Sequence, residues 1–347
     1  MPHMTLMSSP SALRPLDEVL ARLLAGLHPV AAELLPVADA AGWVAAATLR
    51  APAAVPVRPL ALRRGIAVAS AGLIGASPHA PILLAAPPPP VLSGDELPAG
   101  ADAVLPADAV AASGPFHEIG QPAYPGEGAA LAGSDLAADA AIVAAGTTIT
   151  AEAVLALTLA GIASVSVRRP RVAVTGEADG PAAAWLRAWL AQAGCMVTEA
   201  LPADLVLRLA RDPAEHAPGA GPALQPGGEA VLVLDADRRT LVLSPRFDAL
   251  AAGLFALVMP FLAAAAGRGL RSLSRPLTRK IVSQVGLADL ALLRATAEGW
   301  EPLGVGRITL AALLAADAVA VLGPASEGAA AGSMLAAMPL TEPFEPR

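Results

Sequence analysis

One segment restricts the fold of this chain more than any other, because it sets two strands and a helix in a fixed order. Residues 171–176 (RVAVTG) form a short apolar run that ends in Thr-Gly and is typical of a buried strand. A predicted helix follows, with Pro181 in its first turn and Gly194 at its C-cap, and the next strand begins at Cys195. Strand, helix and strand in this order predict a βαβ unit, and hence an α/β domain with a parallel sheet.

Three further apolar runs extend this domain as strands, at residues 204–210, 230–235 and 240–244. A long apolar segment, residues 249–267, then raises the question of a membrane span. Pro260 interrupts it, no aromatic belt flanks it, and Asp248 and Gly267 suit the caps of a soluble helix. We therefore expect a buried helix and no membrane association.

The rest of the chain divides by composition. Leucine and valine recur at helical spacing over residues 15–27, and Thr150 suits the N-cap of a second helix over 150–160. Between them, residues 51–143 are rich in proline and glycine with short apolar runs, which predicts a small β domain. Beyond residue 269 the chain again alternates short strand-like segments, with one helix near 310–315.

Charge and cysteine content exclude several classes of protein. The net charge is −7 and no basic stripe is present, which argues against a nucleic-acid partner. The single cysteine, Cys195, excludes an internal disulfide framework and fits a reducing compartment. Residues 1–10 lack the charged and apolar regions of a signal peptide, so we expect a cytoplasmic protein.

The loop at residues 175–181 (TGEADGP) follows the first strand of the βαβ unit, at the edge of a parallel sheet where ligands bind. Thr175 and Gly176 offer a hydroxyl and close backbone approach to an anion. Glu177 and Asp179 offer carboxylate oxygens to Mg²⁺. The alternative interpretation is an acidic turn that only caps the following helix.

Two segments carry a resemblance to a known family. Residues 92–108 (LSGDELPAGADAVLPAD) are similar to the MTGAxLPxGADAVVxxE element of the molybdopterin molybdotransferases, which include bacterial MoeA and the gephyrin E domain. Residues 171–180 (RVAVTGEADG) resemble their TGDEL element. Further resemblances follow in the family's order at residues 15–56, 60–70, 124–136, 145–170, 223–228, 241–267 and 314–335.

This resemblance implies a multidomain α/β plus β fold in an elongated homodimer. Each subunit would contain a helical stalk (residues 10–50 and 144–170), a small β domain (51–143), an α/β molybdopterin-binding domain (171–268) and a C-terminal β domain (269–343). It also implies a transferase of molybdenum-cofactor biosynthesis, which inserts molybdate into adenylylated molybdopterin with Mg²⁺. The family's cleft lies between the α/β domain of one subunit and the β domain of the other.

The resemblance further implies roles for individual residues. Glu177, Asp179 and Glu127 would be catalytic, with Glu177 and Asp179 as metal ligands. The residues expected to bind molybdopterin are Thr175, Gly176, Pro226, Gly227, Ser244, Arg246, Ser93, Gly94 and Arg64.

Several family residues are replaced. Arg64 stands where the family has the acid of DGYA, Gly128 replaces the last acid of GED, and Ala178 replaces the second acid of TGDEL. The expected Gly-Gly-x-Ser-x-Gly loop is missing, and LPGNP has become LSPRF. Fewer carboxylates predict weak Mg²⁺ binding. The alternative is therefore a non-catalytic protein that binds or delivers molybdopterin, for example to one molybdoenzyme; a third hypothesis is a structural protein that holds a partner.

Overall fold

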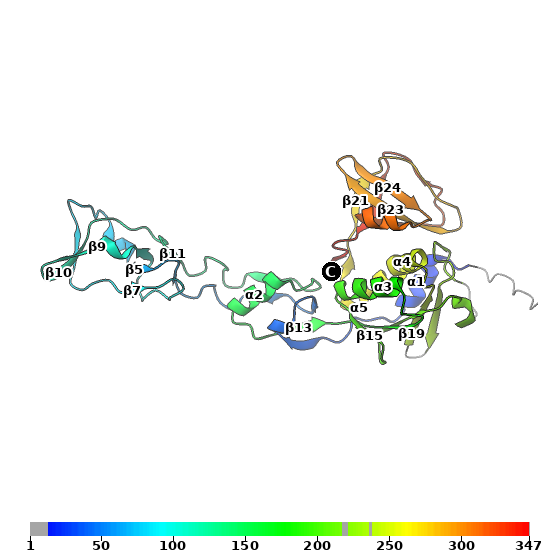
Figure 1. Cartoon of the computed structure of the whole chain (residues 1–347), viewed down its shortest axis with the longest axis horizontal. Coiled ribbons are helices and arrows are strands. Elements are labelled where there is room, and N and C mark those ends of the chain that lie inside the picture. Colours follow the sequence, from blue (N-terminus) through cyan, green and yellow to red (C-terminus); the bar gives the residue numbers. More distant parts are fainter. Residues whose placement is uncertain (1–12, 217–220, 236–237, 347) are drawn as a thin grey trace, which may run out of the picture.

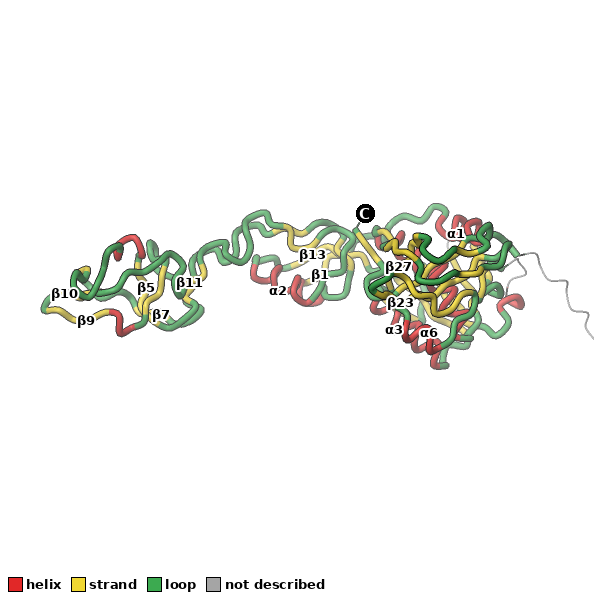
Figure 2. The backbone as a smooth tube through the Cα atoms, turned by 90° about the horizontal axis from the view of Figure 1, so that it is seen from above, coloured by secondary structure: helices red, strands yellow, loops and turns green. Residues whose placement is uncertain are grey.

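A computed structural model describes residues 13–216, 221–235 and 238–346, and it shows an elongated molecule in four parts (Figure 1). A small β module lies at one end, a narrow stem follows, and an α/β domain with a C-terminal β domain forms the bulky other end. The same order is seen from above in Figure 2. The fold class predicted from the sequence, α/β with additional β structure, agrees with this arrangement.

The α/β domain has a five-stranded sheet in the order β15-β14-β16-β19-β18. Strands β15, β14, β16 and β19 are parallel, and β18 closes one edge antiparallel to β19. The predicted βαβ unit is confirmed as β14, α3 and β15. The bounds are β14 (Arg171–Gly176), α3 (Pro181–Gln192), β15 (Met196–Thr198), β16 (Leu205–Leu209), β18 (Val231–Asp235) and β19 (Arg238–Leu243).

The long apolar segment is a buried core helix, as predicted. It runs as α4 (Phe247–Gly253), a π-helical turn (Leu254–Val258) and α5 (Met259–Ala266), and most of it is enclosed by protein. The π turn ends two residues before Pro260, which has no N–H to donate to an α-helical bond. The Met259 amide closes the turn with a bond to the Leu254 carbonyl. Gly267 ends the helix with φ +72°, the left-handed C-cap expected of glycine.

The C-terminal domain is a β-sheet packed on this helix. Its order is β17-β23-β25-β27-β21, with β24 beside β23. The bounds are β17 (Leu224–Gln225), β21 (Leu273–Pro276), β23 (Ala288–Thr296), β24 (Gly299–Val305), α6 (Leu310–Ala315), β25 (Ala318–Leu322) and β27 (Met334–Pro339). Leu290, Leu292 and Val319 share one buried cluster with Leu250 and Leu257 of the long helix, so the two domains have a common core.

The stem is built mainly from strands. Its sheet contains β1 (Glu33–Pro36), β13 (Ser164–Arg168) and β2 (Val44–Ala45), covered by α2 (Ala151–Leu159), and β3 (Leu49–Arg50) pairs with β12 (Ala141–Val143). The prediction of a helical stalk over 10–50 and 144–170 is not confirmed. Helix α1 (Leu16–Leu24) packs in the α/β core instead, because Leu16, Val19 and Leu23 bury their side chains against that domain.

The distal β module consists of short strands in three small sheets, β7-β5-β8, β6-β10-β9 and β11-β4. Their bounds are β4 (Leu60–Ala61), β5 (Gly65–Val68), β6 (Ile82–Leu84), β7 (Pro90–Val91), β8 (Ala103–Leu105), β9 (Val110–Ser113), β10 (Phe116–Ile119) and β11 (Ala129–Ala130). Short pairs elsewhere are β20 (Gly269–Leu270) with β28 (Phe344–Glu345), and β22 (Ile281–Val282) with β26 (Gly328–Ala329). Four 3₁₀ turns complete the described elements: Val37–Asp39, Ser70–Leu73, Ala107–Ala109 and Pro213–His216.

Candidate functional site

The carboxyl edge of the parallel sheet is shaped by Gly176, the last residue of β14. Its φ is +82°, and a Cβ at this position would clash with the Leu209 carbonyl oxygen at the end of β16. The next residue donates its amide, since Glu177 N–H bonds that same carbonyl at 2.8 Å. Glycine therefore allows β14 and β16 to close together and fixes Glu177 at the sheet edge, just before helix α3.

The carboxylate of Glu177 is already paired with a cation at the same sheet edge, the Arg211 guanidinium. Its Oε1 accepts a hydrogen bond from the Arg211 amide at 3.0 Å, and its Oε2 lies 3.0 Å from Arg211 Nε. Asp179 lies in the turn before α3 and is exposed. Among the described residues, no three His, Cys, Asp or Glu side chains lie close enough to hold a metal ion. The predicted Mg²⁺ ligation by Glu177 and Asp179 therefore stays a prediction.

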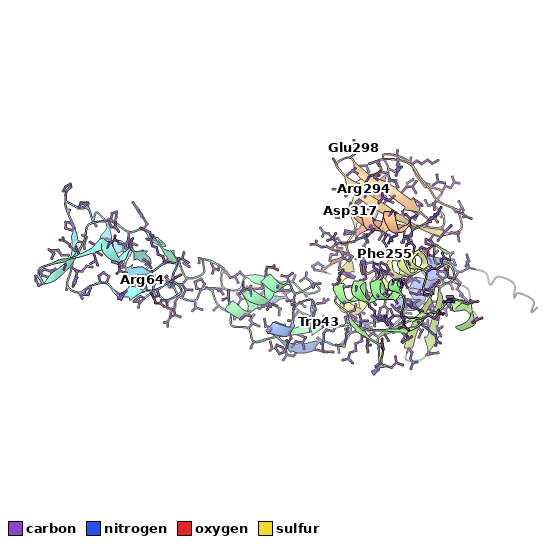
Figure 3. All side chains as sticks on the ribbon, in the orientation of Figure 1. Trp43, Arg64, Phe255, Arg294, Glu298 and Asp317 are labelled. Atoms are coloured by element: carbon purple, nitrogen blue, oxygen red, sulfur yellow. The ribbon has the colours of Figure 1, made fainter. Side chains whose placement is uncertain are left out.

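An apolar cavity of about 570 Å³ opens beside Glu177, between the start of α3 and helix α6 of the C-terminal domain. Aromatic side chains form much of its wall, and Phe255 meets the rings of Trp185 and Trp189 edge-on at 6.5 and 5.6 Å between centroids. Figure 3 shows Phe255 between the two domains. Its wall includes Glu177, Pro181, Trp185, Pro245, Phe247 and Leu314.

The turn between β19 and α4 reaches the same cavity through Pro245 and Phe247. Ser244 is buried, and its hydroxyl accepts a hydrogen bond from the Arg246 amide at 3.3 Å. The Arg246 guanidinium pairs with Asp248 at 2.7 Å and with Glu229 at 3.6 Å. Burial raises the pKa of Asp248, but the hydrogen bonds from Arg246 and the backbone lower it by a larger amount. The pKa of Asp248 therefore lies below its ordinary value.

The Pro226-Gly227 turn lies against helix α4. Gly227 has φ +112°, and a Cβ there would stand 3.4 Å from the Ala252 Cβ. Its carbonyl accepts the Ala230 amide at 3.0 Å, which places Glu229 in the turn that meets Arg246. The structure thus gathers the predicted residues of the α/β domain around the starts of α3 and α4.

The other predicted residues lie in the distal β module. Gly94 has φ +92° and donates its amide to the Ala61 carbonyl at 2.8 Å, and the Ser93 hydroxyl donates to the Leu62 carbonyl at 3.2 Å. The 92–95 turn therefore lies beside the segment that carries Arg64, which is exposed (Figure 3).

Glu127 is bound by Arg63, a neighbour of the predicted Arg64. Arg63 Nη2 lies 3.4 Å from Glu127 Oε1 and donates to the Val104 carbonyl at 2.6 Å. At Gly128 a Cβ would stand 2.5 Å from Arg63 Nε and 2.7 Å from the Val104 oxygen. Arg63 therefore fills the space where the family's acid would start.

Two acids of the 92–108 segment have structural contacts. Asp102 accepts hydrogen bonds from the Ser70 amide and hydroxyl, both at 2.7 Å, and Asp95 accepts from the Leu92 amide at 2.8 Å. These carboxylates shape turns of the distal module.

Within one chain, the predicted residues of the distal module lie far from those of the α/β domain. Arg64, Ser93, Gly94 and Glu127 lie at the end of the molecule opposite Phe255 and the α/β cavity, with the stem between them (Figures 1 and 3). The sequence interpretation also missed Arg211 and Arg63, which pair with Glu177 and Glu127. Nothing in the sequence distinguishes these two arginines from the others, because arginine supplies almost every basic residue of this chain.

Comparison with known proteins agrees with the resemblance seen in the sequence. Residues 14–161 match the family described as MoeA N-terminal region (domain I and II). Residues 14–161 therefore carry the N-terminal region of the MoeA family. The match covers helix α1, the distal module and most of the stem, so it includes both elements of the family's N-terminal region.

Solved structures of MoeA proteins have the same fold over almost the whole chain. A molybdopterin biosynthesis MoeA protein from Pyrococcus horikoshii aligns with a TM-score of 0.67 and 21% identity, covering 95% of this chain and 99% of that one. A molybdenum cofactor biosynthesis protein from Pyrococcus furiosus aligns with a TM-score of 0.59 and 16% identity, covering 94% and 99%. No curated protein matches the chain at a significant level.

Proposed function

We propose that this protein binds molybdopterin, or adenylylated molybdopterin, at the carboxyl edge of its α/β sheet, and that it serves molybdenum-cofactor biosynthesis in the cytoplasm. The observation that carries the proposal is the single cavity that joins Glu177, the start of α3 and the turn before α4. In open parallel sheets, ligands bind at this edge. The named functions of the solved MoeA structures support the choice of ligand.

The cavity suits a ligand with a planar ring and a phosphate. Helix α3 has twelve residues and begins at Pro181 after Gly180, which makes no side-chain capping bond, so its first free amides can bind an anion. Trp185, Phe247 and Phe255 provide flat apolar surface for a ring.

The residues present do not fit a resident Mg²⁺ ion. Such a site needs carboxylate oxygens that are free to face the cation. Glu177 has the guanidinium of Arg211 at its carboxylate, and Asp179 is an exposed acid in the loop before α3. In the distal module, Arg63 occupies the position of the missing acid at Gly128. The geometry therefore supports binding and delivery of molybdopterin best.

A second candidate function is molybdate insertion, the family's molybdotransferase reaction, with molybdate as substrate. The observation that favours it is the distal module, where the 92–95 turn is hydrogen-bonded to Ala61 and Leu62 and where Glu127 pairs with Arg63, the neighbour of Arg64. These residues are too distant from the cavity to act within one chain (Figure 3). A homodimer in which each distal module faces the partner's cavity would unite them.

Apolar side chains on the stem support such a dimer. Leu34 of β1 and Leu155 and Leu159 of α2 are 71%, 61% and 59% exposed. We propose that these exposed leucines contribute to the contact surface of the dimer. Light scattering should give the mass of two chains, and a single-chain mass would overturn the homodimer.

Two measurements test the proposal and separate its two candidates. Calorimetry with molybdopterin should show binding, and absence of binding would contradict both. Release of AMP from adenylylated molybdopterin, followed with molybdate and Mg²⁺, then distinguishes them: turnover identifies a transferase, and binding without turnover identifies a delivery protein.

A further inference from the structure

Arg268 is a buried cation at the junction of three parts of the molecule. It follows helix α5 and is 2% exposed. Its Nη1 donates to the Thr148 hydroxyl of the stem at 3.3 Å, and its Nη2 donates to the Ala193 carbonyl at the end of α3. The centroid of the Phe344 ring, in the C-terminal segment, lies 3.3 Å from its Cζ.

The charge of Arg268 has no carboxylate partner among the described residues, and its buried Nε has no hydrogen-bond partner there. Two nearby arginines, Arg169 and Arg171, share the carboxylate of Glu33, whereas Arg168 bonds the Ala46 carbonyl and has no carboxylate among the described residues. Burial lowers the pKa of Arg268 to about 10. A buried guanidinium without an opposite charge is unfavourable, so this position would gain from an anion.

A cavity of about 460 Å³ lies beside Arg268. Four threonines of the stem and tail, Thr147, Thr148, Thr150 and Thr341, contribute to its wall, and Gln192 of α3 adds a side-chain amide. The one carboxylate in the wall, Glu342, is 73% exposed and is bound by Arg271 at 2.6 Å. A buried cation among hydroxyl and amide donors matches the chemistry that binds phosphate-like ions.

We propose that this cavity is a binding site for a small tetrahedral oxyanion, with Arg268 and Thr148 as its main ligands. The anion would supply the charge that Arg268 lacks and would connect the stem loop, the end of α3 and the C-terminal segment. This cavity adjoins the one beside Glu177, because Trp189 and Leu340 line both, but Arg268 and Thr148 line only this one. The inference therefore does not depend on the proposed function.

The test is calorimetry and thermal unfolding of the full chain with sodium phosphate, sulfate and molybdate, each against sodium chloride at equal ionic strength. We expect oxyanion binding and a rise in the unfolding temperature, both absent with chloride. The three salts distinguish phosphate, sulfate and molybdate as the natural ion.

Three variants locate the site. Thr148→Val removes one hydroxyl with little change of shape, and Arg268→Met removes the charge; we expect each to weaken binding at least about tenfold, because charge-assisted bonds are lost. Arg294→Met is the control, since Arg294 pairs with Glu301 at the far side of the C-terminal domain (Figure 3). If Arg268→Met fails to fold, the oxyanion affinity of Thr148→Val alone tests the site. Equal binding by wild type and Thr148→Val, or no oxyanion binding by wild type, would overturn the proposal.

Discussion

Glu177 and Arg211 form an ion pair at the end of two adjacent parallel strands, with 3.0 Å between Oε2 and Nε and a second bond from the Arg211 amide. The pair joins the residue after β14 to the segment after β16. It neutralises the Glu177 carboxylate, which the family resemblance assigns to a metal. Both side chains are solvent-exposed, so the pair contributes on the order of 0.2–1 kcal/mol, which a single substitution removes.

The first prediction concerns this pair. Arg211→Met should free the Glu177 carboxylate and strengthen divalent-cation binding several-fold, because a competing cation is lost. Paramagnetic Mn²⁺, followed by its solution EPR signal, measures this. The control is Arg294→Met, which leaves Glu177 paired. Unchanged Mn²⁺ binding in Arg211→Met would show that the ion pair does not limit cation binding here.

The second prediction concerns Gly176. Gly176→Ala should destabilise the protein by about 2–4 kcal/mol, because alanine at φ +82° is strained and its Cβ meets the Leu209 carbonyl. Urea unfolding followed by circular dichroism gives this free energy. Gly180→Ala is the matched control, since a Cβ at Gly180 meets no atom within 4 Å. Equal stability of the two variants would contradict the close approach of β14 and β16.

The third prediction follows from Glu33, which joins the stem to the α/β domain. The hydrogen bond from Arg169 lowers the pKa of Glu33 below its ordinary value of 4.5. A depressed folded-state pKa adds stability that is present above pH 4.5 and is lost as the pH falls through the folded-state value. The stability difference between wild type and Glu33→Gln should therefore shrink on acidification below pH 4.5. A difference that is constant from pH 7 to pH 3 would exclude this linkage.

The fourth prediction concerns Cys195. Burial raises the pKa of this thiol to about 12, so almost no thiolate exists at pH 8. Native protein should react with Ellman's reagent far more slowly than protein unfolded in urea, which should release one thiol per chain. Rapid reaction of the native protein would mean that Cys195 is accessible.

The sequence was informative where a pattern has one physical solution. The order of apolar strand, capped helix and strand over residues 171–197 predicted the βαβ unit, and Gly267 correctly marked the end of the long helix. Helix α1 shows the limit: its apolar face was visible, but periodicity does not say what a face packs against. It packs on the α/β core, and the stem is formed by β1, β2 and β13 instead.

The site was harder to predict for a similar reason. Glu177 and Arg211 are 34 residues apart, and only the parallel pairing of β14 with β16 brings them together. The sequence pointed to Arg64 in the distal module, whereas Arg63 makes the contact with Glu127. Both arginines lie in the bend between β4 and β5, where no strand alternation exists from which to read the direction of each side chain.

The central claim, that the cavity beside Glu177 binds molybdopterin, is tested most directly by calorimetry with wild type, Phe247→Ala and Phe116→Ala. Phe247 lines the cavity and is 38% exposed, while Phe116 lies in the distal module and is 44% exposed, so the two truncations are matched in residue type and exposure. We predict saturable binding by wild type and Phe116→Ala, and binding at least about tenfold weaker by Phe247→Ala, because a stacking surface is lost. Absence of binding by wild type, or equal binding by all three proteins, would contradict the account.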